Sequence, residues 1–265
     1  MNGSGGRLIG PAPPAASSKE FDDLRRTWQT LGEEDPLWAI LTHPDRRRGR
    51  WDLEEFLATG ETDVARYDGL LHDAGHSGSF ASVLDFGCGV GRLSLAWGRR
   101  ADSVTGVDIA ATMIDHGRRV VTTAPNVRLL VNDRVDLRQF PDATFDLAFS
   151  HICLQHMPWP LAARYIAEFG RVTAPGGYVA FQLPSRGPKG RSRRRRIVDV
   201  LPSGVRKRYR RWRRGTAVVF DMYFTDPADV VAVAREAGLD RCRQEPDGSA
   251  GADTEGYIYI FHRRG

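Results

Sequence analysis

From Ser82 onward, short apolar runs alternate with longer stretches in which apolar residues recur at helical spacing. The short runs are apolar along most of their length, as strands of a parallel sheet are when both faces are covered. Strands are expected at 83–86, 103–108, 127–131, 145–150 and 178–183, with a last strand at 257–262. Helices are expected near 92–100, 111–123, 161–172 and 227–237. This alternation predicts an α/β fold with a doubly wound sheet.

The chain before this region shows helical spacing only. Residues 19–31 place Phe21, Leu24 and Trp28 on one side of a helix. Asp35 and Pro36 are typical of a helix start. Asp52 is expected to cap the short helix DLEEFL, and a separate helix is expected from about Glu61 to Ala74. We therefore expect a flexible tail at 1–17, a helical cap at 18–78 and an α/β domain at 79–265.

Composition excludes several classes of protein. The chain has 265 residues, of which 41% are hydrophobic and 27% charged, so it is not disordered throughout, collagenous or a coiled coil. Its three cysteines form no C-x-x-C pair, which excludes a disulfide framework and a four-cysteine zinc site. We expect no metal. Because no apolar stretch is long enough to span a membrane and the N-terminus lacks the apolar core of a signal peptide, a cytoplasmic protein is expected.

The positive charge is concentrated in one segment. Residues 186–214 hold 14 of the 38 Lys and Arg residues and one acid, whereas the rest of the chain has 24 basic and 32 acidic residues. The segment belongs to an expected insertion at 184–224, between the fifth strand and the last helix. Three interpretations stay open: a solvated lid, a site for an anionic small acceptor, and a nucleic-acid surface on which Tyr209 and Trp212 stack with bases.

The sequence VLDFGCGVGR at 83–92 is the strongest chemical signal. A strand leads into Gly87, Gly89 and Gly91, which allow the sharp turn and close backbone approach that a bound ligand requires. The third glycine of a dinucleotide fingerprint is replaced by Arg92, so a nucleoside without a pyrophosphate fits better. The next strand ends in Asp108, where an acid accepts hydrogen bonds from ribose hydroxyls. The third strand also ends in polar residues, at 132–133.

Four stretches resemble the successive motifs of class I S-adenosylmethionine-dependent methyltransferases, in order and in spacing: VLDFGCGVGR, VTGVDIAATMI, VNDRVDLRQFPDATFDLAFSHICLQHMP and APGGYVAFQ. The resemblance implies a Rossmann-like sheet of seven strands with the last strand antiparallel, and S-adenosylmethionine as cofactor. The residues that it implies around the cofactor are Gly87, Gly89 and Gly91 in the loop, Asp85 near the methionine part, Asp108 at the ribose, Asp133 at the adenine amine and Ile109 on the adenine face.

The remaining candidates concern the reaction. The fourth strand ends in SHICLQHMP, which places His151 and His156 near the expected position of the methyl group. His156 is the better candidate for a general base, with a packing role as the alternative and alignment sufficient for an amine acceptor. The segment around Arg50 resembles one that closes over the cofactor in some of these enzymes, so Arg50 is a candidate partner for the cofactor carboxylate.

We expect a methyltransferase that acts on O or N of a small molecule, such as a sugar, a glycolipid or a natural-product intermediate. The alternatives are a nucleic-acid methyltransferase and an inactive cofactor-binding scaffold. Nucleic acid is disfavoured because no N-P-P-Y-like sequence follows the fourth strand. The intact glycine loop and the strands that end in acids argue against the scaffold. The oligomeric state stays open.

Overall fold

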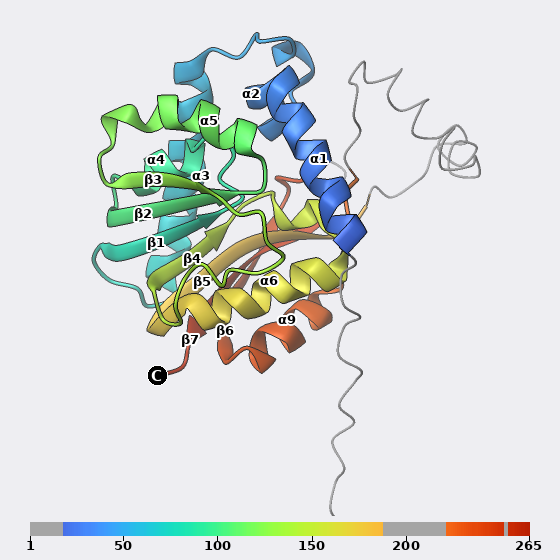
Figure 1. The fold of residues 1–265 in the computed structure, drawn as a ribbon. Coiled ribbons are helices and arrows are strands. Elements are labelled where there is room, and N and C mark those ends of the chain that lie inside the picture. The colour runs from blue at the N-terminus through green and yellow to red at the C-terminus, as the bar shows by residue number, and fades with distance from the viewer. Residues whose placement is uncertain (1–17, 188–220, 252–253) are drawn as a thin grey trace, which may run out of the picture.

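The computed structural model describes residues 18–187, 221–251 and 254–265, which form a central seven-stranded sheet (Figure 1). The strand order is β3-β2-β1-β4-β5-β7-β6. The first five strands of this order are parallel, and β7 runs antiparallel to both of its neighbours. The strands are β1 (Phe80–Phe86), β2 (Ala101–Asp108), β3 (Val127–Val131), β4 (Phe145–Ser150), β5 (Thr173–Arg186), β6 (Leu239–Asp247) and β7 (Glu255–Arg263). The predicted doubly wound sheet with an antiparallel last strand is confirmed.

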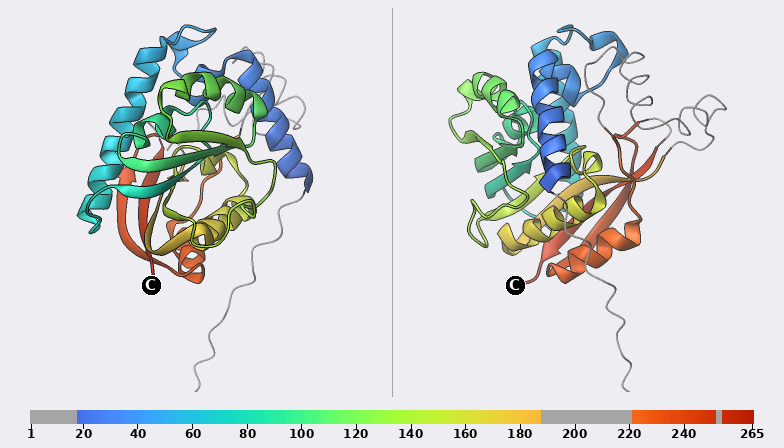
Figure 2. Two further views of the ribbon diagram at one scale, coloured as in Figure 1. Left: turned by 60° about the vertical axis from the view of Figure 1, so that its left-hand side comes forward. Right: turned by 45° about the vertical axis from the view of Figure 1, so that its right-hand side comes forward.

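Helices cover both faces of the sheet (Figure 2). The α-helices of the described residues are α1 (Ser18–Glu34), α2 (Pro36–Ile40), α3 (Leu53–Asp73), α4 (Arg92–Trp97), α5 (Ala111–Val120), α6 (Trp159–Val172) and α9 (Pro227–Glu236). α6 and α9 pack on one face, where Leu84 and Phe181 join Phe169 in an apolar core. α3, α4 and α5 pack on the other face around Val83 and Trp97. The strands are covered on both sides, which explains their continuous apolar runs.

The structure contains one strand that the hydrophobic pattern does not predict. β6 pairs only with β7 and lies at the edge of the sheet. Its sequence, LDRCRQEPD, is mostly polar, and most of its side chains are exposed or half-buried. Charged side chains are common on edge strands because they oppose pairing with another chain. An edge strand of this kind therefore lacks the apolar run that identifies the buried strands.

α3 is one continuous helix of 21 residues, not the two helices that the sequence suggests. Asp52 caps it as predicted, with its carboxylate accepting a hydrogen bond from the Glu55 N–H at 3.0 Å. Gly60 lies inside the helix, where a Cβ would come within 2.7 Å of the Arg92 carbonyl oxygen of α4. The glycine therefore permits close packing of two helices and does not end one. α3 also contributes Val64, Tyr67 and Leu71 to the core on its face of the sheet, so it packs as part of the α/β layers.

α1 and α2 lie across the sheet edge at which the parallel strands end, and they pack on α5 (Figures 1 and 2). Asp35 accepts from the Trp38 N–H and starts α2, as predicted. A third apolar cluster holds these helices in place through Leu31, Ala39 and Met113. The first two helices thus form a cover over the strand ends.

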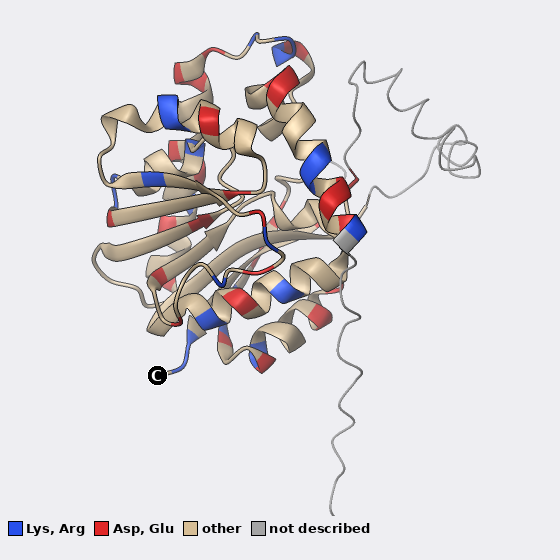
Figure 3. Cartoon of the chain, viewed as in Figure 1, with Lys and Arg blue, Asp and Glu red and all other residues tan. Residues whose placement is uncertain are grey.

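Acidic and basic residues are interspersed along α1, α6 and α9 (Figure 3). Some of them form ion pairs within a helix, such as Arg25 with Asp22 at 3.2 Å.

The expected tail at 1–17 and most of the basic insertion lie outside the described residues. Within the described residues, no helix has the length and apolar character needed to cross a membrane.

Candidate functional site

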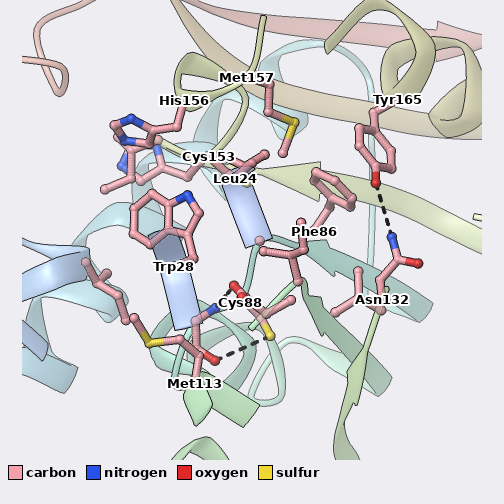
Figure 4. A pocket seen from close by; sticks show the side chains of 18 of the residues that line it. Leu24, Trp28, Phe86, Cys88, Met113, Asn132, Cys153, His156, Met157 and Tyr165 are labelled. Carbon is pink, nitrogen blue, oxygen red and sulfur yellow. Dashed lines mark hydrogen bonds between the residues drawn. The ribbon is translucent and has the colours of Figure 1, made fainter. Parts of the chain in front are cut away.

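A pocket lies at the carboxyl ends of β1 to β4, with α1 and α2 contributing to its wall (Figure 4). Its empty space, including the mouth, is about 870 Å³, which suits a small organic ligand. Most lining side chains are apolar. The polar exceptions are Arg92, Asp108, Asn132, His151 and His156. A pocket of this kind at the switch point of a doubly wound sheet is a typical ligand site.

The glycine loop forms the floor of the pocket. Gly87 and Gly89 line it with φ angles of +78° and +54°, a backbone conformation that other residues rarely adopt. A Cβ on Gly87 would collide with the Cys153 side chain, and one on Gly89 would lie 2.5 Å from Cδ1 of Ile40. Gly91 also has a positive φ but packs against Val121 and Leu129, so it shapes the start of α4 without lining the pocket.

Asp108 follows the loop on the neighbouring strand β2. Its carboxylate accepts hydrogen bonds from the Gly89 and Ala110 N–H groups, both at 2.9 Å. Burial nevertheless raises the pKa of Asp108 to about 6, since the charged form is removed from water. Asp85 lies behind the loop and does not line the pocket. It accepts from the Ser94 hydroxyl at 2.6 Å, and burial raises its pKa to about 6 as well.

Asn132 lies at the β3 end of the pocket and is buried. Its backbone N–H continues the ladder by donating to the Asp108 carbonyl, and its side-chain amide nitrogen lies 3.4 Å from the Tyr165 hydroxyl (Figure 4). Tyr165 in turn donates to the Arg134 carbonyl at 2.6 Å. The Oδ1 atom of Asn132 has no hydrogen-bond partner among the described residues. A buried amide oxygen without a partner is costly, so this atom is ready to accept from a ligand.

The opposite end of the pocket holds a polar cluster supplied by α3. Arg92 donates through Nη1 to Asp63 at 2.6 Å and to the Thr59 hydroxyl at 3.0 Å. The ring of His151 lies between α3 residues, with Nδ1 3.0 Å from the Tyr67 hydroxyl and Nε2 3.8 Å from Asp63. Burial lowers the pKa of His151 to about 4. His151 is therefore neutral near pH 7, and both ring nitrogens face protein groups.

His156 lies on the other side of the pocket, in the turn after β4. Its Nδ1 is 2.9 Å from the Asp221 carbonyl oxygen, which only accepts, so Nδ1 carries the proton. In the neutral ring Nε2 is then an acceptor, and the Gln155 amide nitrogen, 3.2 Å away, donates a hydrogen bond to it. The Trp28 ring of α1 meets the imidazole edge-on at 5.2 Å between centroids (Figure 4). Both ring nitrogens of His156 therefore have protein partners.

Residues 83–177 match the family model of a methyltransferase domain. A malonyl-[acyl-carrier protein] O-methyltransferase of Salmonella typhimurium is 40% identical over 111 residues, which cover 41% of each chain. A ubiquinone biosynthesis O-methyltransferase of Pseudomonas aeruginosa is 30% identical over 203 residues, covering 72% of this chain and 77% of that enzyme. The chain belongs to the class I S-adenosylmethionine-dependent methyltransferases. The chain spans only part of the length of the malonyl relatives, 41% of the Salmonella enzyme and 54% of the one from Serratia marcescens.

Solved structures agree with the fold of the methyltransferase. The magnesium protoporphyrin IX methyltransferase of Synechocystis PCC 6803, with bound SAH, has a TM-score of 0.63 and 17% identity over 92% of this chain and 99% of that one. A SAM-dependent methyltransferase of Methanosarcina mazei has a TM-score of 0.57 and 20% identity over 74% of this chain and 97% of that one. At these identities the likeness concerns the fold.

The pocket of the methyltransferase fits its cofactor, S-adenosylmethionine. The unpartnered Oδ1 of Asn132 suits an adenine amine, and the buried carboxylate of Asp108 suits ribose hydroxyls. Gly87 and Gly89 line the pocket with backbone alone and allow Cys153 and Ile40 to pack closely beside the loop. Ile109 also lines the pocket, as expected of a residue on the adenine face.

Besides Asp85 and Gly91, two further predicted cofactor residues do not line the pocket. Asp133 is exposed and outside the pocket lining, because the alternation at the end of β3 turns Asn132 inward and the next residue outward. Arg50 is exposed as well. Arg48 and Gly49, just before it, have positive φ angles and donate their N–H groups to Asp35, which forms a turn that leaves Arg50 at the surface.

Sequence reasoning missed three polar residues that the structure brings to the pocket or to its wall. Asn132 was noticed only as a polar strand end. Arg92 was considered only as the replacement of a glycine, and Asp63 carries no local signal because its contact with Arg92 is between helices. Two signals are present in the sequence: the arginine directly after the glycine loop and the polar strand end at Asn132.

Proposed function

We propose that the protein is an O-methyltransferase that acts on a hydroxyl group of a small, largely apolar acceptor, with His156 as the general base. The observation that carries this proposal is the hydrogen bond between Nδ1 of His156 and the Asp221 carbonyl. The Asp221 carbonyl holds the proton on Nδ1, so Nε2, which accepts a hydrogen bond from the Gln155 amide, is the ring nitrogen that takes the acceptor proton in this proposal. A carboxylate acceptor has no proton to remove, so a positioned base favours a hydroxyl. The relatives named above are O-methyltransferases, which agrees with transfer to oxygen.

When bound, S-adenosylmethionine supplies a methyl group on a sulfonium, an electrophile that needs no further activation by the protein. The residues of the chain then have two tasks, to align the acceptor and to take its proton. His156 accepts the hydroxyl proton on Nε2 and becomes an imidazolium. The hydrogen bond from Nδ1 to the Asp221 carbonyl strengthens as this charge develops. His151 is a weaker candidate for this step because burial lowers its pKa to about 4.

The walls near His156 support an apolar acceptor. Phe21, Leu24 and Trp28 of α1 line this side of the pocket, and Met157 lies beside the imidazole on the segment after β4 (Figure 4). The aromatic rings of Phe21 and Trp28 favour an acceptor that is flat and unsaturated, because such a molecule makes aromatic contacts with them. For the cofactor we propose that Asp108 binds the ribose and Asn132 the adenine amine. The backbone of Gly87 and Gly89 lies against the cofactor.

The test is a screen for methyl transfer with a panel of matched acceptors. Phenols, aliphatic alcohols, amines and free carboxylic acids of similar size are incubated with the protein and labelled S-adenosylmethionine. The methylated atom is then identified by NMR spectroscopy. We expect transfer to hydroxyl oxygen, with phenols preferred. Transfer only to carboxylates or amines would contradict the proposed acceptor class.

A further inference from the structure

Arg92 is the most deeply buried cation of the pocket. It is the first residue of α4, directly after the glycine loop, and it is 2% exposed. An arginine is always charged, so burying it is costly unless its donors are satisfied. The close approach of α3 at Gly60 packs against its backbone and side-chain stem. The packing therefore fixes the position of Arg92, and each of its buried donors needs a hydrogen-bond partner.

Within the described residues, only the Nη1 group of the guanidinium has hydrogen-bond partners. Nη1 donates to Asp63 and Thr59, which are four residues apart on the inner face of α3. Nε and Nη2 are buried and have no hydrogen-bond partner among the described residues. In an arginine, the Nε–H and one Nη2–H bond lie parallel on the same edge. This edge is the fork that binds both oxygens of a carboxylate.

The position of this fork along the sheet edge indicates which carboxylate it meets. Following the strand order β3-β2-β1-β4, the pocket presents Asn132, then Asp108, then the glycine loop and then His151. The guanidinium of Arg92 shares Asp63 with the His151 ring, so it lies at the end farthest in this order from Asn132. S-adenosylmethionine has its adenine at one end and its amino-acid carboxylate at the other. An adenine placed at Asn132 therefore directs the carboxylate toward Arg92.

We propose that Arg92 binds the methionine carboxylate of the cofactor through its Nε and Nη2 atoms, and that Asp63 and Thr59 act as positioning residues for it. This inference rests on the cofactor orientation given under the proposed function. It replaces Arg50, which is exposed and outside the pocket lining, as the partner of that carboxylate. It also makes α3 part of the cofactor site, since α3 supplies both groups that hold the guanidinium.

The test compares two ligands that differ in the group concerned. S-adenosylhomocysteine carries the amino-acid carboxylate, whereas 5′-methylthioadenosine lacks the whole amino-acid part. Calorimetry gives the affinity of each ligand for the wild type, Arg92→Lys, Asp63→Asn and the control Arg50→Lys. Lysine keeps the charge but not the fork. We expect Arg92→Lys to bind S-adenosylhomocysteine about ten- to a hundredfold more weakly and 5′-methylthioadenosine unchanged. Asp63→Asn should show a smaller loss of the same kind, and Arg50→Lys none.

Each other outcome has a defined meaning. Equal losses for both ligands would overturn the proposal, because Arg92 would then act on the pocket as a whole. An unchanged affinity for S-adenosylhomocysteine with a raised KM for the acceptor would assign the fork to an acceptor anion and would also overturn it. If Arg92→Lys binds neither ligand because it does not fold, Asp63→Asn decides by the ratio of the two affinities. Failure of the proposed function appears separately, as absent hydroxyl methylation in a wild type that binds both ligands normally.

Discussion

The ionisation of Asp108 predicts a pH dependence of cofactor binding. In the empty protein burial raises the pKa of this carboxyl to about 6. Ribose hydroxyls donate to the charged form, so the bound state favours the carboxylate and its pKa falls on binding. At about pH 5 roughly nine-tenths of the empty protein carries a protonated Asp108, which lowers the apparent affinity about tenfold relative to pH 7.5, a difference of about 1.4 kcal/mol.

The assay is calorimetry with S-adenosylhomocysteine from about pH 5 to about pH 7.5, a range in which the ligand keeps its charge. Asp108→Asn should flatten this dependence and weaken binding at the upper pH by about 1.5–3 kcal/mol. An amide cannot accept from both the Gly89 and the Ala110 N–H groups, so part of this loss comes from the loop. Asp85→Asn is the matched control, because it removes the other raised carboxyl and leaves Asp108 in place. A flat profile in the wild type, or an unchanged slope in Asp108→Asn, would refute the reasoning.

The same shift has a consequence for stability in the empty protein. The folded pKa of Asp108 lies above the value near 4 of the unfolded chain. The stabilisation from this carboxyl is therefore complete below about pH 4 and is lost as the pH rises through 6. The two-unit shift corresponds to about 3 kcal/mol. Ligand binding at neutral pH offsets this loss, so S-adenosylhomocysteine should raise the melting temperature more at pH 7 than at pH 5.

Three further predictions concern single positions. His156→Ala should lower kcat about 10²–10⁴-fold at unchanged affinity for S-adenosylhomocysteine, and a loss below about tenfold in steady-state kinetics would leave alignment as its role. Asn132→Ala should weaken S-adenosylhomocysteine binding by about 0.5–1.5 kcal/mol but not the binding of S-inosylhomocysteine, which lacks the adenine amine; equal losses in calorimetry would contradict the assignment. Gly60→Ala should lower the free energy of unfolding by about 1–3 kcal/mol, because the new Cβ meets the backbone of α4. Gly69→Ala, on an open face of the same helix, should raise it by about 0.5–1 kcal/mol, and denaturant unfolding that gave both variants the same sign would argue against this packing.

The parts of the fold that were predictable are those with a local signal. Buried parallel strands give continuous apolar runs, and the glycine loop must use residues that tolerate positive φ. Asp108 was recognisable because it ends a strand next to that loop. β6 was not recognisable, since an edge strand needs few apolar side chains. The break expected before Glu61 was wrong because Gly60 serves a contact between helices, which helix propensity does not report.

The missed site residues depend on contacts between distant segments. Successive side chains of a strand point to opposite sides, so a shift of one residue at the end of β3 decides whether Asn132 or Asp133 faces the pocket. The role of Nε and Nη2 of Arg92 can be inferred only from the fold, because Thr59 and Asp63 of α3 bind its Nη1 group. Arg50 appeared suitable by charge and position in the chain, but the turn at Arg48 directs it outward.

The division of the pocket suggests where acceptor specificity is encoded. The family model matches residues 83–177, which include the glycine loop, Asp108, Asn132 and both histidines. Trp28 and the other α1 side chains beside His156 precede that match, as do Thr59 and Asp63 of α3. The matched part therefore supplies most of the proposed cofactor contacts, the proposed base and Met157, whereas the rest of the proposed acceptor wall comes from a helix outside it. Because α1 lines the pocket without forming its floor, we expect changes in α1 to affect the acceptor more than the cofactor. Exchanging α1 side chains is the direct way to alter acceptor choice while S-adenosylhomocysteine affinity stays constant.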